Sequence, residues 1–235
     1  LNPVESIHLA CLREFSSGAQ GDLWETNQQA DGSFSDLDYS QEPGPKFQLP
    51  LVYRRLFSMA QAWVSSNSPL AGDLKLSNRI RLGLSYAAET PVAKKRPGET
   101  AAWRREVFLE PGRLGPLLAL VGTRFESQSL KSSLALAKAC CAPPFQQTGT
   151  PLLEHCLARL YYVAASRDVS VLDRLRGEME GLLLPSWDPD RAGVQADGSW
   201  QAGGVLDLGG EGIFWAEQLS RYGRLTEGSG AQLSN

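Results

Sequence analysis

The chain has 235 residues, of which 42% are hydrophobic, and its formal net charge is −3 at pH 7. This length is enough for one sizeable hydrophobic core, and the small negative charge provides no broad positive field for phosphate backbones, so nucleic acid is not an expected partner. No stretch approaches the ~18 uninterrupted apolar residues of a membrane span, so a membrane is not an expected partner either.

Apolar residues recur every three or four positions in segment after segment, which is the spacing of an amphipathic helix. These stripes cover residues 49–63, 76–87, 114–121, 130–137, 153–163, 171–182 and 213–219. Proline and glycine breakers separate them, and no run alternates for long enough to predict a strand. The pattern predicts an all-α fold of antiparallel helix hairpins. We expect residues 1–225 to form the helical domain, and the polar, glycine-containing residues 226–235 to be a flexible tail or a cut linker.

The four cysteines lack the paired spacing of a zinc site, and only two histidines are present. We therefore expect neither a metal nor another cofactor. The cysteines are interpreted as small buried residues on helices, and the histidines as core or surface residues.

The sequence Gln-Ala-Asp-Gly-Ser followed by an aromatic residue occurs twice, at residues 29–34 and 195–200. Asp-Gly favours a tight turn, because glycine accepts a positive φ and the aspartate side chain can bond the backbone two residues on. Two interpretations remain open for the terminal aromatic residues Phe34 and Trp200. Each ring either packs into the core beside a helix end, or projects from a loop and stacks on the apolar face of a sugar ring.

These turns and further motifs, taken in order, resemble the helical domain of polysaccharide lyase family 8, which includes chondroitin, hyaluronate and xanthan lyases. The motifs include Asp31-Gly32-Ser33-Phe34, Ser68-Pro69-Leu70, Pro111-x-x-Leu114-Gly115, Thr148-Gly149 and Gly209-Gly210-x-Gly212. The resemblance covers roughly residues 22–224. It implies an incomplete (α/α) toroid, an acidic, uronic-acid-containing polysaccharide as partner, and a secreted or periplasmic protein.

Enzymes of the family cleave by β-elimination: an asparagine neutralises the uronate carboxylate, and a histidine and a tyrosine transfer protons. By the motifs, Glu106 stands at the asparagine position, Gly203 near the histidine position and Glu211 at the tyrosine position. Glu106 and Glu211 are therefore the candidate catalytic residues. The alternative is that both are solvated glutamates in first helical turns, where the helix dipole favours them.

The run Trp103-Arg104-Arg105 combines an aromatic ring with two guanidinium groups, which suit a carboxylate or sulfate. Its alternative is a helix start at which the arginines pair with nearby glutamates. Trp24 and Trp187 are further aromatic candidates. The predicted substrate-binding residues are Phe34, Trp103, Arg104, Arg105 and Trp200.

Three functions remain open at this point. The order of the motifs favours a divergent polysaccharide lyase. The second possibility is a non-catalytic carbohydrate-binding or scaffold module of the same fold. The third is a glycoside hydrolase that uses Glu106 and Glu211, because two facing carboxylates are what that reaction requires.

Overall fold

The computed structural model of the chain describes residues 2–16, 27–40, 48–95, 105–141, 150–185, 193–196, 199–202, 205–206 and 210–233. Its longer helices are α1 (Pro3–Phe15), α2 (Leu49–Val64), α3 (Leu74–Glu89), α6 (Leu114–Val121), α7 (Lys131–Cys140), α8 (Thr150–Ser166), α9 (Leu172–Leu183) and α10 (Gly210–Thr226). Shorter elements are α4 (Pro91–Lys95), the π-helical turn η2 (Arg105–Leu109), and the 3₁₀ turns η3 (Ser127–Leu130) and η4 (Val169–Val171).

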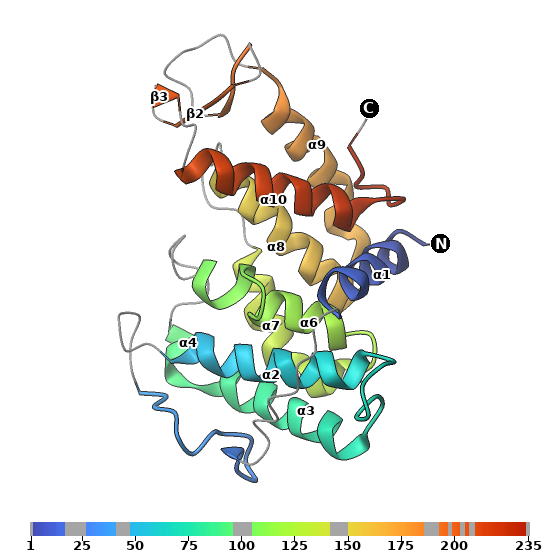
Figure 1. Ribbon diagram of the computed structural model, residues 1–235, viewed down its shortest axis with the longest axis vertical. Helices are drawn as coiled ribbons and strands as arrows, with labels where there is room; N and C mark the ends of the chain where they lie inside the picture. Colours follow the sequence, from blue (N-terminus) through green and yellow to red (C-terminus); the bar gives the residue numbers. More distant parts are fainter. Residues whose placement is uncertain are drawn as a thin grey trace.

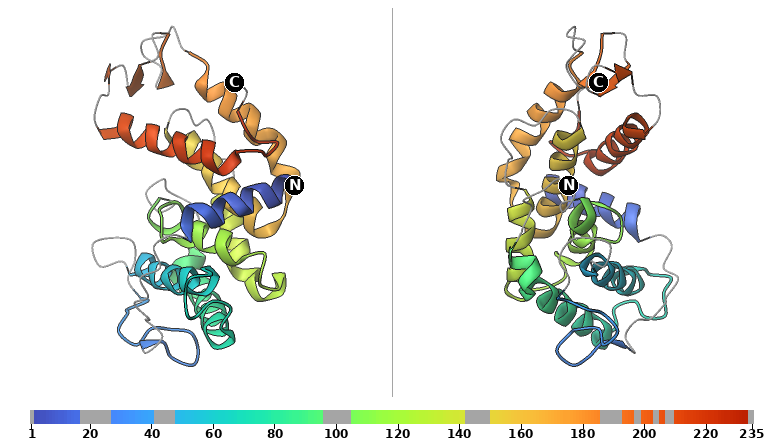
Figure 2. Two further views of the ribbon diagram at one scale, coloured as in Figure 1. Left: turned by 45° about the vertical axis from the view of Figure 1, so that its right-hand side comes forward. Right: turned by 90° about the vertical axis from the view of Figure 1, so that its left-hand side faces the viewer.

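The helices form two layers that are visible edge-on in the right-hand view of Figure 2. One layer has the order α2, α6, α1, α10, and the other has the order α3, α7, α8, α9, with α8 packed against α6, α1 and α10 across the interface. The pair α2 and α3 lies at one end of the molecule and the pair α9 and α10 at the other (Figure 1). The layers therefore make an open arc, which confirms the predicted incomplete (α/α) toroid.

Each predicted helical stripe lies on a helix, but α1 was not predicted. Its start carries ordinary helix signals: the Asn2 side chain accepts a hydrogen bond from the backbone nitrogen of Val4 at 2.8 Å, and Pro3 stands in the first turn. Although α1 comes first in the sequence, it lies between α6 and α10. The first segment of the chain thus completes a layer whose other helices come later.

The core joins the two layers through large aromatic side chains. Phe15, at the end of α1, lies 6.0 Å from Phe57 of α2 and 5.9 Å from Tyr161 of α8, measured between ring centroids. Burial of each such ring contributes about 1.5–3 kcal/mol. A Cβ atom added at Gly122 would lie 2.6 Å from the Cα of Ala165, so the absence of a side chain lets the end of α6 approach α8 closely. All four cysteines are buried, as expected.

Three short strands, which the sequence did not predict, lie beside the N-terminal half of α10 (Figure 1). They are β1 (Gly193–Val194), β2 (Trp200–Ala202) and β3 (Val205–Leu206), and they pair antiparallel in the order β1-β2-β3. Strands of two or three residues contain too few alternations to give a recognisable period. The second copy of the repeated turn connects β1 to β2.

The prediction of a structureless tail is wrong for the described residues that follow α10. The chain turns back there, and Ala231 is completely buried. Its carbonyl oxygen accepts a hydrogen bond from the hydroxyl of Tyr222 at 2.9 Å. Leu233 is partly buried against the core as well. Two apolar residues in a polar segment do not form a helical stripe, so the sequence pattern did not predict this packing. None of the helices in the described ranges combines the length and apolar character needed to cross a bilayer.

Candidate functional site

The centre of the candidate site is Arg105, the first residue of η2. Its Nε donates a hydrogen bond of 2.6 Å to Oε1 of Glu154 on α8, and its guanidinium carbon lies 4.7 Å from the ring centroid of Phe214 on α10. One arginine therefore connects η2, α8 and α10, which are far apart in the sequence. We call Arg105, Glu154 and Phe214 the arginine junction. Single π-helical turns such as η2 are frequent at functional sites.

The surroundings of Arg105 fix its position while leaving part of the guanidinium accessible. The side chain of Glu154 is only 1% exposed, whereas that of Arg105 is 41% exposed. A buried carboxylate needs a partner, so the ion pair holds the guanidinium in one place. Among the described residues, the two terminal nitrogens of Arg105 donate no hydrogen bond. They are therefore available to a carboxylate or sulfate, which guanidinium binds through two parallel hydrogen bonds.

The predicted catalytic residues lie on segments that the arginine junction brings together. Glu106 follows Arg105 in η2 and is exposed, and its carbonyl oxygen accepts a hydrogen bond of 2.6 Å from Nε of Arg113. Glu211 lies in the first turn of α10, and only its backbone is described. Because Arg105 contacts Phe214 one turn further along α10, the segments that carry Glu106 and Glu211 are neighbours. Trp103 and Arg104, like Trp24 and Trp187, lie outside the described residues.

The first of the two predicted aromatic platforms is buried. Phe34 is 1% exposed and belongs to the main core cluster, and the guanidinium of Arg55 lies 5.1 Å from its ring centroid. Arg55 in turn donates hydrogen bonds of 2.7 and 2.6 Å to the two carboxylate oxygens of Asp36. These bonds hold the pKa of Asp36 below its usual value. The expectation that Phe34 stacks on a sugar is therefore wrong, because core residues and Arg55 cover its ring.

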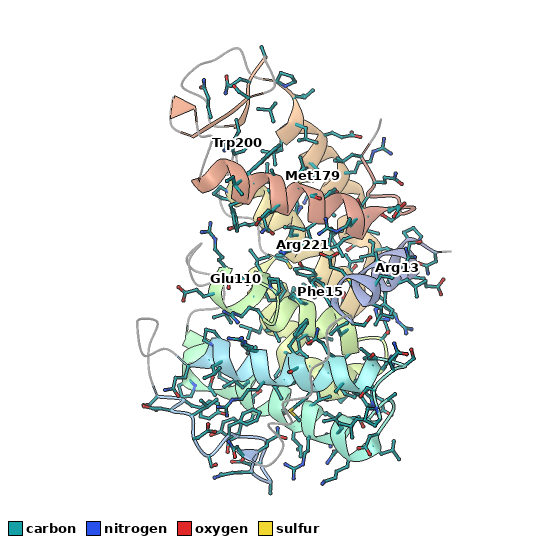
Figure 3. All side chains as sticks on the ribbon, in the orientation of Figure 1. Arg13, Phe15, Glu110, Met179, Trp200 and Arg221 are labelled. Carbon is teal, nitrogen blue, oxygen red and sulfur yellow. The ribbon has the colours of Figure 1, made fainter. Side chains whose placement is uncertain are left out.

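The second predicted platform, Trp200, is 7% exposed and stacks on Trp215 of α10, with ring centroids 4.3 Å apart and planes inclined by 26°. Figure 3 shows Trp200 beside the N-terminal half of α10. Its ring fastens the strands to the helix, so the expectation of an exposed stacking face is wrong for Trp200 as well. Both rings are buried, as the packing interpretation expects, but Phe34 contacts Arg55 in the middle of α2, and Trp200 lies outside the main core cluster.

Sequence reasoning missed two members of the arginine junction. Glu154 lies within the apolar stripe of α8, next to Leu153 and three residues before Leu157, and both leucines are buried. A carboxylate at such a position requires a cationic partner, so the pattern could have indicated it. Phe214 gave no such signal, because an aromatic residue in an amphipathic helix is ordinarily a core residue.

Comparisons with known proteins identify the fold. The family profile described as polysaccharide lyase family 8, N terminal alpha-helical domain, matches residues 10–235. No curated protein sequence matches the chain.

Solved structures share the fold at low sequence identity. A chondroitinase AC lyase studied as oligosaccharide complexes is 19% identical, with a TM-score of 0.75 over 99% of this chain and 34% of that one. A Paenibacillus xanthan lyase is also 19% identical, with a TM-score of 0.65 over 99% of this chain and 21% of that one. The Streptomyces coelicolor A3 chondroitin AC lyase in complex with chondroitin sulphate is 18% identical, with a TM-score of 0.71 over 99% of this chain and 34% of that one.

This chain thus spans about a third or less of the length of these enzymes. The match to the family profile extends over nearly all of its residues, and the open two-layer arc is the fold that these lyases share. The chain belongs to polysaccharide lyase family 8, as a member of its N-terminal α-helical domain.

Proposed function

We propose that this chain is the helical part of a divergent polysaccharide lyase that acts on an acidic, uronic-acid-containing polysaccharide by β-elimination. Two of the structural neighbours are described with chondroitin sulphate or as a xanthan lyase, and the chain belongs to the same family. Such polymers are extracellular substrates, so the proposal includes secretion.

The observation that carries the proposal is the geometry of Arg105. Its guanidinium is fixed by Glu154 on one side and by Phe214 on one face, and its terminal nitrogens are open within the described structure. The guanidinium offsets the negative charge of a uronate carboxylate that is bound there. The proton on the neighbouring sugar carbon then becomes more acidic, because the carbanion that its removal creates is stabilised.

Glu106 and Glu211 are the proposed proton-transfer groups. In the elimination, a base removes the proton from C5 of the uronate, the C4–O bond breaks as a C4–C5 double bond forms, and the departing glycosidic oxygen receives a proton. Carboxyl groups can perform both transfers when one is ionised and the other protonated. The exposure of Glu106 and the position of Glu211 at the start of α10 suit access to a polymer.

The test is incubation of the protein with chondroitin, hyaluronan, xanthan and alginate while the ultraviolet absorbance of the unsaturated uronate product is followed. We expect an increase with at least one polymer, and its loss in Glu106→Gln and Glu211→Gln. No increase with any uronate polymer would contradict the lyase proposal.

The second candidate function is non-catalytic carbohydrate binding. Its support is the presence of Gly203 and Glu211 at the positions where the resembled enzymes have histidine and tyrosine. Tryptophan fluorescence titration with acidic oligosaccharides separates the two functions, because Trp215 stands next to Phe214 of the arginine junction. Binding without any absorbance increase would favour this candidate. New reducing ends without an absorbance increase would instead indicate a glutamate-dependent hydrolase.

A further inference from the structure

A cavity of about 510 Å³ lies between α2 and the loop that follows η2. Its wall includes Arg54, Phe57, Ser58 and Gln61 of α2 and Gly112 of the loop. Its volume is within the ~300–1,000 Å³ of typical small-molecule sites. Because η2 begins at Arg105 and leads directly into this loop, the cavity and the arginine junction lie along one continuous segment of the chain.

The fold builds this cavity through specific contacts. Gly112 has φ +77°, a backbone conformation that favours glycine, and it turns the loop back against α2. A Cβ atom at Gly112 would lie 3.6 Å from Cγ of Arg54 and 3.8 Å from Cδ1 of Phe57, so the loop packs closely on these side chains. Gln61 donates a hydrogen bond of 2.6 Å from its amide to the carbonyl oxygen of Phe15, which ties this wall to the end of α1.

The chemistry of the wall suits an anionic sugar. Two arginines, Arg54 and Arg55, contribute to it together with a hydroxyl and an amide, and none of the described residues that line it is acidic. Arg55 is buried and bound by Asp36. Arg54 is exposed and makes no hydrogen bond or ion pair with the residues that the structure describes. The cavity therefore presents one guanidinium whose charge no described carboxylate offsets.

We propose that this cavity is a second subsite for the polysaccharide, in which Arg54 binds a carboxylate or sulfate of one sugar while Ser58 and Gln61 bind its hydroxyl groups. The inference rests on the proposed function, in which a polysaccharide binds at Arg105. Such a polymer must continue along the protein surface, and the loop after η2 leads from Arg105 to this cavity.

The experiment measures the affinity of the full-length protein for hyaluronan oligosaccharides of increasing length by isothermal titration calorimetry. For the unaltered protein, affinity rises with length once the ligand reaches both subsites. In Arg54→Ala we expect the longest ligand to bind about tenfold more weakly, the value of one charge-assisted hydrogen bond, while the shortest ligand that binds is unaffected. Arg54→Lys keeps the charge and restores part of the affinity.

Two control variants make the outcomes distinguishable. Arg105→Ala weakens binding at every length, whereas Arg176→Ala, on the outer helix α9, changes none. Unchanged affinity of Arg54→Ala at every length overturns the subsite and leaves the proposed function in place, and an equal loss at every length shows that the cavity is not a second subsite. If the unaltered protein binds no acidic oligosaccharide, both the subsite and the proposed function are wrong. Circular dichroism confirms that the Arg54 variants are folded.

Discussion

The two copies of the repeated turn, residues 29–34 and 195–200, share one backbone hydrogen bond in different surroundings. In each copy the backbone nitrogen of the first glutamine donates to the serine carbonyl oxygen at 2.8 Å. The aromatic residue that follows is buried in both. In the first copy, however, Phe34 enters the main core, whereas Trp200 of the second packs outside the main core cluster on α10.

In both copies the aromatic residue attaches its loop to a helix, and the side chains of that helix determine how the ring is held. Phe34 lies beneath Arg55, whose guanidinium is bound by Asp36. Trp200 instead rests on Trp215, beside the segment that carries the arginine junction. Both rings are therefore packing residues, and the arginine junction, which we propose binds the saccharide, is formed by other residues on η2, α8 and α10.

The largest expected effect on the free energy of unfolding comes from removing the two aromatic rings, and we expect the two losses to differ. Phe34→Ala is expected to lower the free energy of unfolding by about 3–5 kcal/mol, because it leaves a cavity in the core. Trp200→Ala is expected to cost about 2 kcal/mol, because its ring lies outside the main cluster. Urea unfolding followed by circular dichroism measures both. Equal losses would contradict the distinction between the two attachments.

The turn that carries Phe34 also depends on a glycine. Gly32 has φ +95°, and a Cβ atom there would lie 2.4 Å from the carbonyl carbon and oxygen of Leu82 on α3. Gly32→Ala is therefore expected to lower the free energy of unfolding by about 2–3 kcal/mol, from backbone strain and displacement of the loop. The same unfolding experiment measures it. A change of less than about 0.5 kcal/mol would show that this turn is not docked on α3 in solution.

Asp36 gives the first attachment a dependence on pH. Its pKa in the folded protein is below the ordinary aspartate value because Arg55 donates hydrogen bonds to it. Its contribution is therefore complete above about pH 4 and is lost as the pH falls through the folded pKa. Asp36→Asn is expected to cost about 1–2 kcal/mol at neutral pH, because the buried guanidinium loses a charged partner.

Unfolding of Asp36→Asn as a function of pH measures this contribution, and the difference from the unaltered protein should shrink in acid. A difference that stays constant down to pH 2 would contradict the assignment. Trp200→Ala serves as the comparison, since its cost should not depend on pH.

The smallest expected effect on the free energy of unfolding comes from His8. It adds a second change with pH, which must be separated from that of Asp36. Nδ1 of the His8 ring donates a hydrogen bond of 3.0 Å to the carbonyl oxygen of Ala119, and Nε2 shares a hydrogen bond of 2.8 Å with the hydroxyl of Thr123. Burial lowers the pKa of His8 below 6.5. Stability is therefore complete above pH 6.5 and decreases as the pH falls from there to the folded pKa.

We expect His8→Gln to remove the decrease in unfolding free energy that begins as the pH falls below 6.5, while leaving the Asp36 contribution below about pH 4 intact. If that decrease persists in His8→Gln, another group is responsible for it.

Much of the fold was predictable because helical periodicity is a local property. Asp73, for example, precedes α3 and its side chain accepts a hydrogen bond from the backbone nitrogen of Leu76 at 2.7 Å, as its residue type indicates. The spacing of apolar residues likewise gave the positions of α2 and α8. The start of α1 was visible in Asn2-Pro3, but its apolar positions were not counted as a stripe.

The candidate site was less predictable because its contacts are not local. Arg105 was a predicted binding residue, yet its partner Glu154 lies 49 residues away and Phe214 lies on a still later helix. The sequence also did not indicate whether the side chains of Phe34 and Trp200 point into the protein or into solvent. An Asp-Gly turn specifies the bend of the backbone, but burial of the next ring depends on the helix against which the loop docks.

The most direct test of the central claim compares the affinities of Arg105→Ala and Arg176→Ala for an acidic oligosaccharide by tryptophan fluorescence titration. The two arginines are matched, because each binds a glutamate through Nε and their side chains are similarly exposed, at 41% and 45%. We predict that Arg105→Ala binds about tenfold more weakly than the unaltered protein and that Arg176→Ala binds equally well. Equal affinity of all three proteins would contradict the assignment of the arginine junction as the polysaccharide site.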